Sequence, residues 1–374
     1  MPSYKNLLPG DPAPWFQARA TSRPDFAFDT AAGRYLVLCF FATASDARGR
    51  AAVGAALVLQ HLFDDAFASF FGVTIDPTDE AQQRVASRLP GYRFFWDFDG
   101  LVSRLYGAIP HDAEPHKGSV PLRRIWVVLD PTLRVLKVIP FGTDGSDMQA
   151  LETYLNSLPP PSRFAGFEVP APVLVLPHVF EPAFCAQLVA LYEQHGGTET
   201  GFMQQEDGKT VLRYGHDHKR RSDYEIVDPQ IIHHARHLFE RRVLPEILKV
   251  YQFKVTHMER YIVACYSAEE GGHFRAHRDN TTKGTAHRRF AVSINLNEDF
   301  DGGEIRFPEY GPRSFKPPVG GAVVFSCSLL HAVSKMTRGR RYAFLPFLYD
   351  EAASKIREAN SAFLGEGVET YEHS

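Results

Sequence analysis

Cysteine is scarce in this chain, with four residues among 374. Cys39, Cys185, Cys265 and Cys327 lie far apart in the sequence and form neither a C-x-x-C pair nor a cysteine-based metal pattern. This spacing argues against a disulfide-stapled secreted scaffold and favours a reducing cytoplasm as the location.

Long apolar runs and an excess of charge of one sign are missing as well. The most apolar run, residues 35–44, is far shorter than the roughly 20 residues of a membrane-spanning helix. The first residues, MPSYKNLLPGDPAPWF, lack the apolar core of a signal peptide. Lys and Arg number 41 against 44 Asp and Glu, which gives a formal net charge of −3. We therefore expect neither a nucleic-acid partner nor a membrane partner.

The chain is too long for a typical single domain, so we expect two. Prolines at positions 159, 160, 161, 170, 172 and 177 mark the boundary, because proline at this density resists helix and sheet interiors. The sequence predicts a first domain over residues 1–158, a proline-rich linker over 159–168 and a second domain over 169–374.

Buried strands alternate with helical patterns in the first domain. The predicted strands are residues 34–41 and 71–76, followed by a hairpin over 125–130 and 135–139, and the predicted helices are residues 51–67, 79–89, 101–106 and 148–158. A βαβ start with a hairpin finish predicts a thioredoxin-like α/β layer.

Five stretches of this half resemble the peroxiredoxins and occur in that family's order: LLPGDPAPWF, LVLCFFATAS, TIDPTDEAQQ, FFWDFDGLVSRLYG and RRIWVVLDPTLRVLKVI. The family carries its peroxide-attacking cysteine at the start of the helix after the first long strand, where residues 42–48 read ATASDAR. A thiolate is the required nucleophile, and Cys39 lies inside the predicted buried strand. Arg124 aligns with the family's active-site arginine. We expect a retained fold without peroxidase activity, acting as a docking or stabilising module.

The most informative motif of the second domain is His277-Arg278-Asp279, with His331 following 54 residues after His277. Two imidazoles and one carboxylate can bind Fe(II) on one face and leave the opposite coordination positions open. In an extended strand, residues i and i+2 point to the same side, so His277 and Asp279 can reach one metal while Arg278 points away.

Short β-rich segments separated by turn signals surround this motif. They cover residues 260–266, 289–296, 299–307, 320–325 and 342–349. Such a series predicts a double-sheet barrel of the jelly-roll kind. Helical spacing of apolar residues over 181–195 and 231–251 predicts supporting helices.

Residues 257–349 resemble the catalytic core of the 2-oxoglutarate- and Fe(II)-dependent oxygenases, most closely the prolyl 4-hydroxylase group. The resemblance rests on VACYSAEEGGHFRAHRDN, SINLNEDFDGGEIRFPEY, GGAVVFSCSLLHAV and TRGRRYAFLPFLY. In that family the H-x-D triplet and the distal histidine hold iron. The resemblance therefore implies His277, Asp279 and His331 as the iron ligands.

The resemblance also implies residues for the co-substrate. A basic residue about ten positions beyond the distal histidine binds the far carboxylate of 2-oxoglutarate, and here that position is Arg341. A guanidinium can grip a carboxylate through two parallel bonds. Arg340 is the alternative, because a register error of one residue would exchange the two. Tyr266 matches a family tyrosine whose hydroxyl touches the same co-substrate.

The implied reaction is hydroxylation of an unactivated C–H bond, with O2 as second co-substrate, succinate and CO2 as products, and ascorbate as a candidate cofactor. The implied substrate is a small molecule or a peptide, with a prolyl residue or a related amino acid as the family-based target. Asp279 favours hydroxylation over halogenation, since halogenases of this superfamily have a small residue in its place. Two alternatives stay open: a thiol peroxidase or redox sensor using the first domain, and a non-catalytic iron or oxygen sensor.

Other histidines are less informative. His216-Asp217-His218 imitates a metal motif, but three cations follow at 219–221 and disfavour cation binding. We expect a polar loop there. His233, His234 and His237 lie in the predicted supporting helix.

Overall fold

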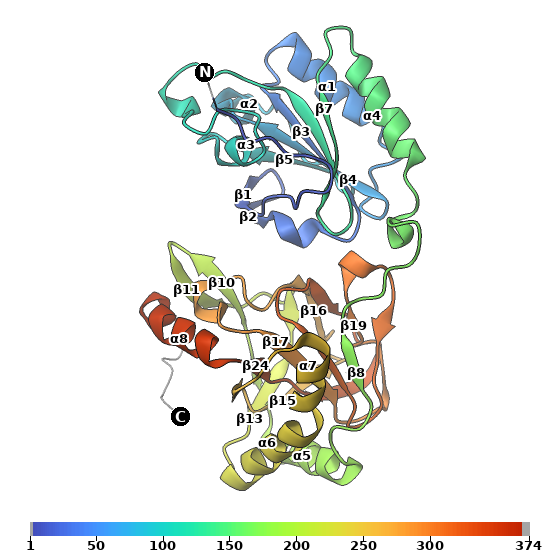
Figure 1. Ribbon diagram of the computed structural model, residues 1–374, viewed down its shortest axis with the longest axis vertical. Coiled ribbons are helices and arrows are strands. Elements are labelled where there is room, and N and C mark those ends of the chain that lie inside the picture. Colours follow the sequence, from blue (N-terminus) through green and yellow to red (C-terminus); the bar gives the residue numbers. More distant parts are fainter. Residues whose placement is uncertain (1–2, 369–374) are drawn as a thin grey trace. The chain divides into compact units, whose positions relative to one another are not determined.

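The computed structural model describes residues 3–368 and divides the chain into two compact units (Figure 1). Unit 1 extends to Pro170 and includes Pro308–Pro312, whereas unit 2 comprises Ala171–Phe307 and the chain from Arg313 onward. Within residues 3–368, no helix is long and apolar enough to cross a membrane.

The proline-rich segment 159–168 is part of unit 1 and not a separate connection. Pro161–Arg163 forms a short 3-10 helix, and the Tyr35 hydroxyl donates a hydrogen bond of 2.9 Å to the carbonyl of Pro159. Because Tyr35 is buried in the core of unit 1, this bond ties the segment to the domain before it.

Unit 1 is built on one seven-stranded sheet with the order β2-β1-β5-β4-β3-β6-β7. Its strands are β1 (Gln17–Ala20), β2 (Arg23–Ala27), β3 (Tyr35–Ala42), β4 (Ala68–Thr74), β5 (Tyr92–Trp96), β6 (Ile125–Leu129) and β7 (Val135–Pro140). Strands β3, β4 and β5 are parallel, while the hairpin β6–β7 joins β3 in antiparallel pairing. This topology confirms the thioredoxin-like layer.

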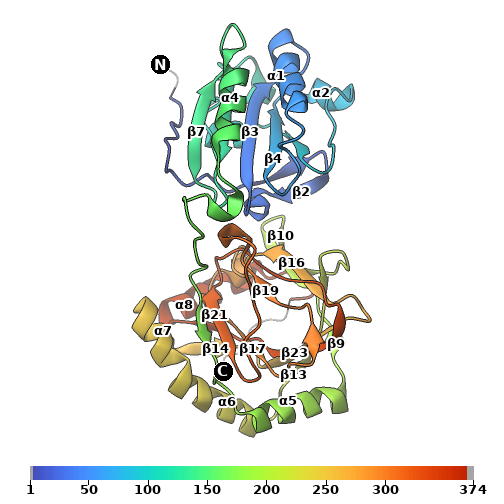
Figure 2. The ribbon, with the colours of Figure 1, turned by 90° about the vertical axis from the view of Figure 1, so that its right-hand side faces the viewer.

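Helices α1 (Ala47–Val58) and α4 (Ser146–Ser157) pack on one face of this sheet (Figure 2). Helix α2 (Pro77–Ala81) follows β4, and α3 (Leu101–Leu105) follows β5. Val37, Cys39 and Phe41 face α1 and α4 in a buried cluster. Residues of opposite parity face an aromatic layer in which Phe71 and Phe95 stack at 5.4 Å. A strand buried on both faces explains the continuous apolar run of β3.

Two helices of unit 1 are shorter than predicted. The pattern over 51–67 gives a helix that ends at Val58, and the chain then turns so that Phe63 enters the core. The pattern over 79–89 gives a helix that ends at Ala81, since Gln83 has a positive φ of 50°. In both places tertiary burial outweighs helical periodicity.

Unit 2 contains the predicted jelly roll of two sheets. The larger sheet has the order β14-β24-β17-β23-β15-β13-β9, with β8, β18 and β21 attached, and the smaller has the order β12-β16-β22-β19-β20. The larger sheet comprises β8 (Leu174–Leu176), β9 (Thr198–Glu199), β13 (Ser222–Glu225), β14 (His257–Glu259), β15 (Ile262–Ser267), β17 (Phe290–Asn295), β18 (Phe300–Asp301), β21 (Ala322–Ser326), β23 (Arg338–Phe344) and β24 (Phe347–Tyr349). The smaller comprises β12 (Lys219–Arg220), β16 (His273–His277), β19 (Ile305–Arg306), β20 (Ser314–Phe315) and β22 (His331–Val333), and β10 (Phe202–Glu206) and β11 (Lys209–Arg213) form a separate hairpin.

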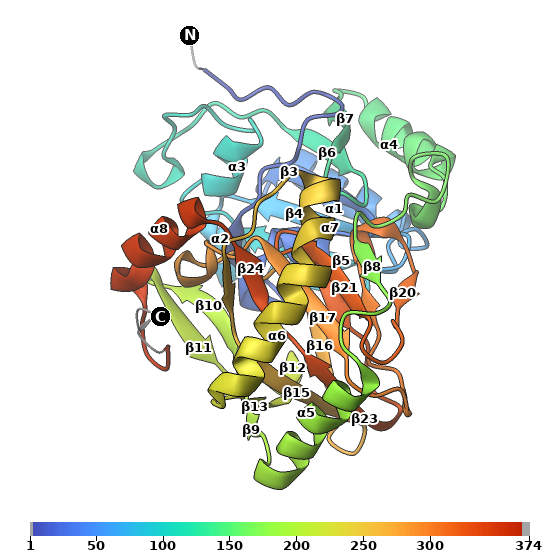
Figure 3. The ribbon, with the colours of Figure 1, turned by 60° about the horizontal axis from the view of Figure 1, so that its bottom comes forward.

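The larger sheet presents alternate residues to its two faces. Cys265 and Tyr342, which pair across β15 and β23, belong to the buried cluster that also holds residues of α5 (Pro182–His195), α6 (Pro229–Arg242) and α7 (Leu244–Tyr251) (Figure 3). The next pair along, Tyr266 and Arg341, therefore faces the barrel interior. Tyr266 packs there against Phe274 of the smaller sheet. The last helix, α8 (Glu351–Ala359), follows β24.

A buried ion cluster ties β14 to the start of β17. Glu259 is 8% exposed and accepts a 2.9 Å hydrogen bond from Arg288 Nε, while His287 Nε2 lies 3.0 Å from its other oxygen. Burial alone would raise the pKa of Glu259, but the charge of Arg288 and the hydrogen bond from His287 lower it to about 2. This carboxylate therefore stabilises the entry to β17.

We expect Glu259→Gln to lower the free energy of unfolding by about 3 kcal/mol at pH 7, because it leaves a buried cation without its carboxylate. A lowered carboxyl pKa contributes stability above its unfolded value of 4.5, and this contribution is lost as pH falls toward about 2. Urea unfolding at pH 7 and pH 3 should therefore show a smaller difference between variant and wild type at pH 3. An equal difference at both pH values would contradict this role.

Candidate metal centre

Antiparallel pairing of β16 with β22 places His277 opposite His331. His277 is the last residue of β16 and His331 is the first of β22. The expectation that Asp279 continues the same strand is wrong, because β16 ends at His277 after a register irregularity. Asp279 is held instead by its own N–H, which donates a 2.9 Å hydrogen bond to the carbonyl of Cys327.

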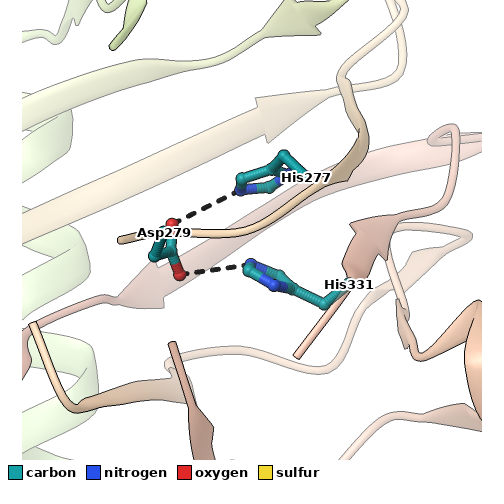
Figure 4. A group of neighbouring side chains, drawn as sticks. All are labelled: His277, Asp279 and His331. Atoms are coloured by element: carbon teal, nitrogen blue, oxygen red, sulfur yellow. Dashed lines mark ion pairs between the residues drawn. The ribbon is translucent and has the colours of Figure 1, made fainter. Parts of the chain in front are cut away.

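The three side chains nevertheless converge (Figure 4). His277 Nε2 lies 3.5 Å from Asp279 Oδ1, and His331 Nε2 lies 3.3 Å from Oδ2. One ligand atom from each residue lies within 4.8 Å of the others. Two imidazole nitrogens and one carboxylate oxygen therefore share one small volume, as predicted.

Backbone carbonyls orient both imidazoles. His277 Nδ1 lies 2.8 Å from the carbonyl of Arg275, and His331 Nδ1 lies 3.0 Å from that of Leu329. A carbonyl can only accept, so Nδ1 carries the proton and the lone pair of Nε2 faces Asp279. This is the arrangement in which a histidine binds metal through one nitrogen and is held through the other.

The charge state of the group also suits a divalent cation. Burial, followed by the neighbouring His277, lowers the pKa of His331 to about 4, so this ring is neutral at neutral pH. Burial alone would raise the pKa of Asp279, but the neighbouring imidazoles of His331 and His277 bring it below its ordinary value. Two imidazoles and an ionised carboxylate are the donor set that suits Fe(II). Phe274 stacks on His277 at 3.5 Å and provides an apolar wall.

The register of β23 separates the two candidate arginines. Arg341 is 2% exposed inside the barrel, whereas the side chain of Arg340 is 50% exposed and lies 3.8 Å from the acidic groups of Glu193 and Glu269. Arg341 donates to Asn295 Oδ1 at 2.9 Å through Nε and to Ser293 Oγ at 2.7 Å through Nη2. These bonds fix the guanidinium and leave Nη1 for a bound carboxylate.

The partners of Arg341 are neutral, so its charge is not compensated by the protein at this point. Burial lowers the pKa of Arg341 to about 10, which still leaves it charged at neutral pH. The ring of Tyr266 lies 5.6 Å from its guanidinium carbon and is itself buried. The pair forms a fixed cationic end of the barrel interior, suited to an anionic ligand.

Three buried charged residues of this interior were not singled out from the sequence. Lys219, Arg221 and Asp223 are 5%, 6% and 9% exposed, although the cations at 219–221 suggested a polar loop. Arg221 Nη2 donates to Asp223 Oδ2 at 2.6 Å, and Arg221 Nη1 lies 3.5 Å from the Tyr266 hydroxyl. The alternate spacing of these residues was the signal that could have found them.

The remaining histidine motif does not form a metal group. His216 pairs with Glu199 at 2.8 Å on the surface, and the ring of His218 lies 4.3 Å from that of Phe202. Over residues 3–368, His277, Asp279 and His331 form the one group of His, Cys, Asp or Glu with metal-binding geometry.

In unit 1, a carboxylate occupies the helix start where a peroxiredoxin would carry its thiol. Asp46 caps α1 by accepting a 2.8 Å hydrogen bond from the N–H of Gly49. It also forms an ion pair with Arg124. The hydrogen bond that Arg124 donates to this carboxylate is the main cause of the lowered pKa of Asp46. Cys39 is fully buried, and burial raises its pKa well above the ordinary value. Arg124 therefore stabilises a carboxylate here.

The family model of the 2OG-Fe(II) oxygenase superfamily matches residues 261–349, which include all three members of the metal group. The PKHD-type hydroxylase PiuC of Pseudomonas aeruginosa is 30% identical over 184 residues, which are 46% of this chain and 75% of that protein. A PKHD-type hydroxylase of Synechococcus sp. is 32% identical over 89 residues, 22% of this chain. Of that relative's own length, this chain spans 39%.

Two solved structures are similar to parts of this chain. A prolyl hydroxylase from Trichoplax adhaerens, solved with a hypoxia inducible factor peptide fragment, is 16% identical, covers 50% of this chain and 86% of its own, and has a TM-score of 0.40. A yeast mitochondrial 1-Cys peroxiredoxin is 18% identical, covers 41% of this chain and 78% of its own, and has a TM-score of 0.33.

Replacing any member of the metal group should abolish tight metal binding. We expect His277→Ala, Asp279→Ala and His331→Ala each to weaken Fe(II) binding by about 100-fold or more, since even residues behind a ligand typically contribute 10–100-fold. Anaerobic equilibrium dialysis measures this, with the exposed His216→Ala as matched control. Wild-type affinity in any one of the three variants removes that residue from the group.

Unit 1 should not reduce peroxide. Because Cys39 is fully buried and its thiol stays protonated, the full chain should consume hydrogen peroxide with dithiothreitol no faster than its Cys39→Ser variant. Peroxide consumption that disappears in Cys39→Ser would make unit 1 a working peroxidase.

Proposed function

The chain belongs to the PKHD-type hydroxylases of the 2OG-Fe(II) oxygenase superfamily, and we propose that it hydroxylates an unactivated C–H bond with 2-oxoglutarate and O2 as co-substrates. The observation that carries this proposal is the position of two groups inside one barrel: the His277, Asp279 and His331 donor set, and the buried guanidinium of Arg341. The donor set suits Fe(II), and the guanidinium of Arg341 suits the far carboxylate of a co-substrate bound to that ion.

Fe(II), when bound, supplies the chemistry that couples O2 to the C–H bond. Overall, one oxygen atom enters the substrate as hydroxyl and the other enters succinate, while 2-oxoglutarate loses CO2. The protein's part is to hold and orient. His277, Asp279 and His331 would hold the ion, and Arg341 would fix the far carboxylate through Nη1 while Ser293 and Asn295 keep its guanidinium in place.

Tyr266 lies beside Arg341 and would assist with the same carboxylate through its hydroxyl. Phe274 and Phe325 flank the two imidazoles, with ring distances of 3.5 Å to His277 and 4.7 Å to His331. These apolar walls exclude water from the reacting atoms, which strengthens the electrostatic contacts inside.

The target within the substrate is proposed to be a prolyl residue or a related amino acid, in a peptide or as a free molecule. The support is the resemblance of the core to prolyl 4-hydroxylases. Ascorbate as a further cofactor and the cytoplasm as the location stay predictions from the sequence. The rival peroxidase function is disfavoured by the burial of Cys39, and the sensor function by the fixed, charged Arg341.

Succinate formation by the Fe(II)-loaded full chain tests the proposal. We expect Arg341→Ala to raise the 2-oxoglutarate concentration for half-maximal turnover on the order of 10- to 100-fold, because it removes hydrogen bonds to a charged group. Arg340→Ala, with the same change one residue away on the outer face, should change it less than about threefold. A larger effect at Arg340 would contradict the assignment, and Fe(II) binding without any succinate formation would favour the sensor.

A further inference from the structure

The segment from Lys219 to Asp223 crosses from one sheet of the barrel to the other. Lys219 pairs with Phe274 of β16 in the smaller sheet, and Asp223 pairs with Ala264 of β15 in the larger sheet. Arg221 lies between β12 and β13, at the crossing itself. Both cations are therefore placed where the two sheets that carry the metal group and Arg341 come together.

The side chains of Lys219 and Arg221 each lie near an aromatic ring that borders the proposed reaction site. Lys219 Nζ lies 5.2 Å from the ring of Phe274, which stacks on His277 at 3.5 Å. The guanidinium carbon of Arg221 lies 5.9 Å from the ring of Tyr266.

The charges of this cluster do not balance. Within residues 3–368, Asp223 is the one carboxylate that pairs with Arg221, at 2.6 Å, and it also lies 3.5 Å from Arg260. Lys219 donates to two neutral acceptors, Thr200 Oγ1 at 3.0 Å and the carbonyl of Gly201. Arg221 and the partly exposed Arg260 thus share one carboxylate, whereas buried charges in proteins are normally paired. Burial and the nearby Arg221 lower the pKa of Lys219 well below its ordinary value, so a bound anion would favour its charged form.

Arg221 also has an unused donor. Its Nε is buried and has no hydrogen-bond partner among the described residues. A buried N–H without a partner is unfavourable, and a bound acceptor would satisfy it. The carboxylates of 2-oxoglutarate would not fill this role in the proposed reaction, because they would be held at the metal group and at Arg341.

We propose that Lys219 and Arg221 bind a carboxylate of the substrate, which makes the substrate a small molecule with a free carboxylate, such as a free amino or imino acid. This inference rests on the proposed hydroxylase function and narrows its substrate class. The planar guanidinium offers directed donors and the ammonium adds a point charge, so together they select a carboxylate over a neutral amide. An internal residue of a peptide carries no such group.

Calorimetric titration of the anaerobic full chain, loaded with Fe(II) and 2-oxoglutarate, tests this directly. The probes are the free amino acids, L-proline included, each matched with its primary amide. We expect at least one acid to bind 10-fold or more tightly than its amide. If no acid binds, or if acids and amides bind alike, the proposal is overturned.

Variants assign the effect to the cluster. Arg221→Gln should reduce binding of the preferred acid to the level of its amide, and Lys219→Met should do the same while leaving the ion pair of Arg221 with Asp223 in place. The second variant decides the matter if the first does not fold. Arg220→Gln is the matched control, because Arg220 points to the surface and contacts the carbonyl of Glu270. A preference for the acid that survives in both variants overturns the proposal.

Binding of 2-oxoglutarate is the separate readout. It should be unchanged in Lys219→Met and Arg221→Gln, and its loss in either would place that residue in the co-substrate site and overturn the proposal. Failure of the wild-type, Fe(II)-loaded protein to bind 2-oxoglutarate would instead contradict the proposed function itself.

Discussion

The pairing of β16 with β22 is the constraint on which the candidate site depends. It sets His277 directly opposite His331, although 53 residues of chain separate them, and the two rings lie 4.2 Å apart. Asp279 completes the group only because the strand ends and its N–H is held by Cys327. A shift of this pairing by one residue would turn one imidazole to the other face of the sheet. The metal group therefore exists only in this register of β16 and β22.

The barrel interior holds several buried basic side chains, and two of them, Arg341 and Lys219, are held by neutral polar partners and not by ion pairs. Arg341 is held by a serine and an asparagine, which orient it without neutralising it. Lys219 is likewise held by neutral oxygens. Glu259, whose role is structural, has the cations Arg288 and Arg357 beside it. The difference matches a division between charges that stabilise the fold and charges that we propose bind anionic ligands.

In unit 1, the residue at the start of α1 has a structural role. Asp46 caps α1 and pairs with Arg124, so the cation that would favour a thiolate in a peroxiredoxin stabilises a carboxylate here. The one cysteine of the neighbouring strand, Cys39, is part of the core. The thioredoxin-like topology itself depends on packing across β3, β4 and β5, which does not require a thiol at the start of α1.

The amino-acid sequence by itself determined the two-part organisation, the class of each fold and the identity of the metal group. These follow from local pattern: apolar runs, period-two alternation, and an H-x-D triplet with a distal histidine inside strand-like segments. Helix ends at Val58 and Ala81 could not be predicted, because burial of Phe63 and backbone geometry at Gln83 decided them. Only the tertiary structure turned Arg341 inward and Arg340 outward, and brought Lys219 and Arg221 beside the same interior. Which face of a strand is buried depends on the segments that pack against it. Those segments are distant in the chain, and the local sequence does not identify them.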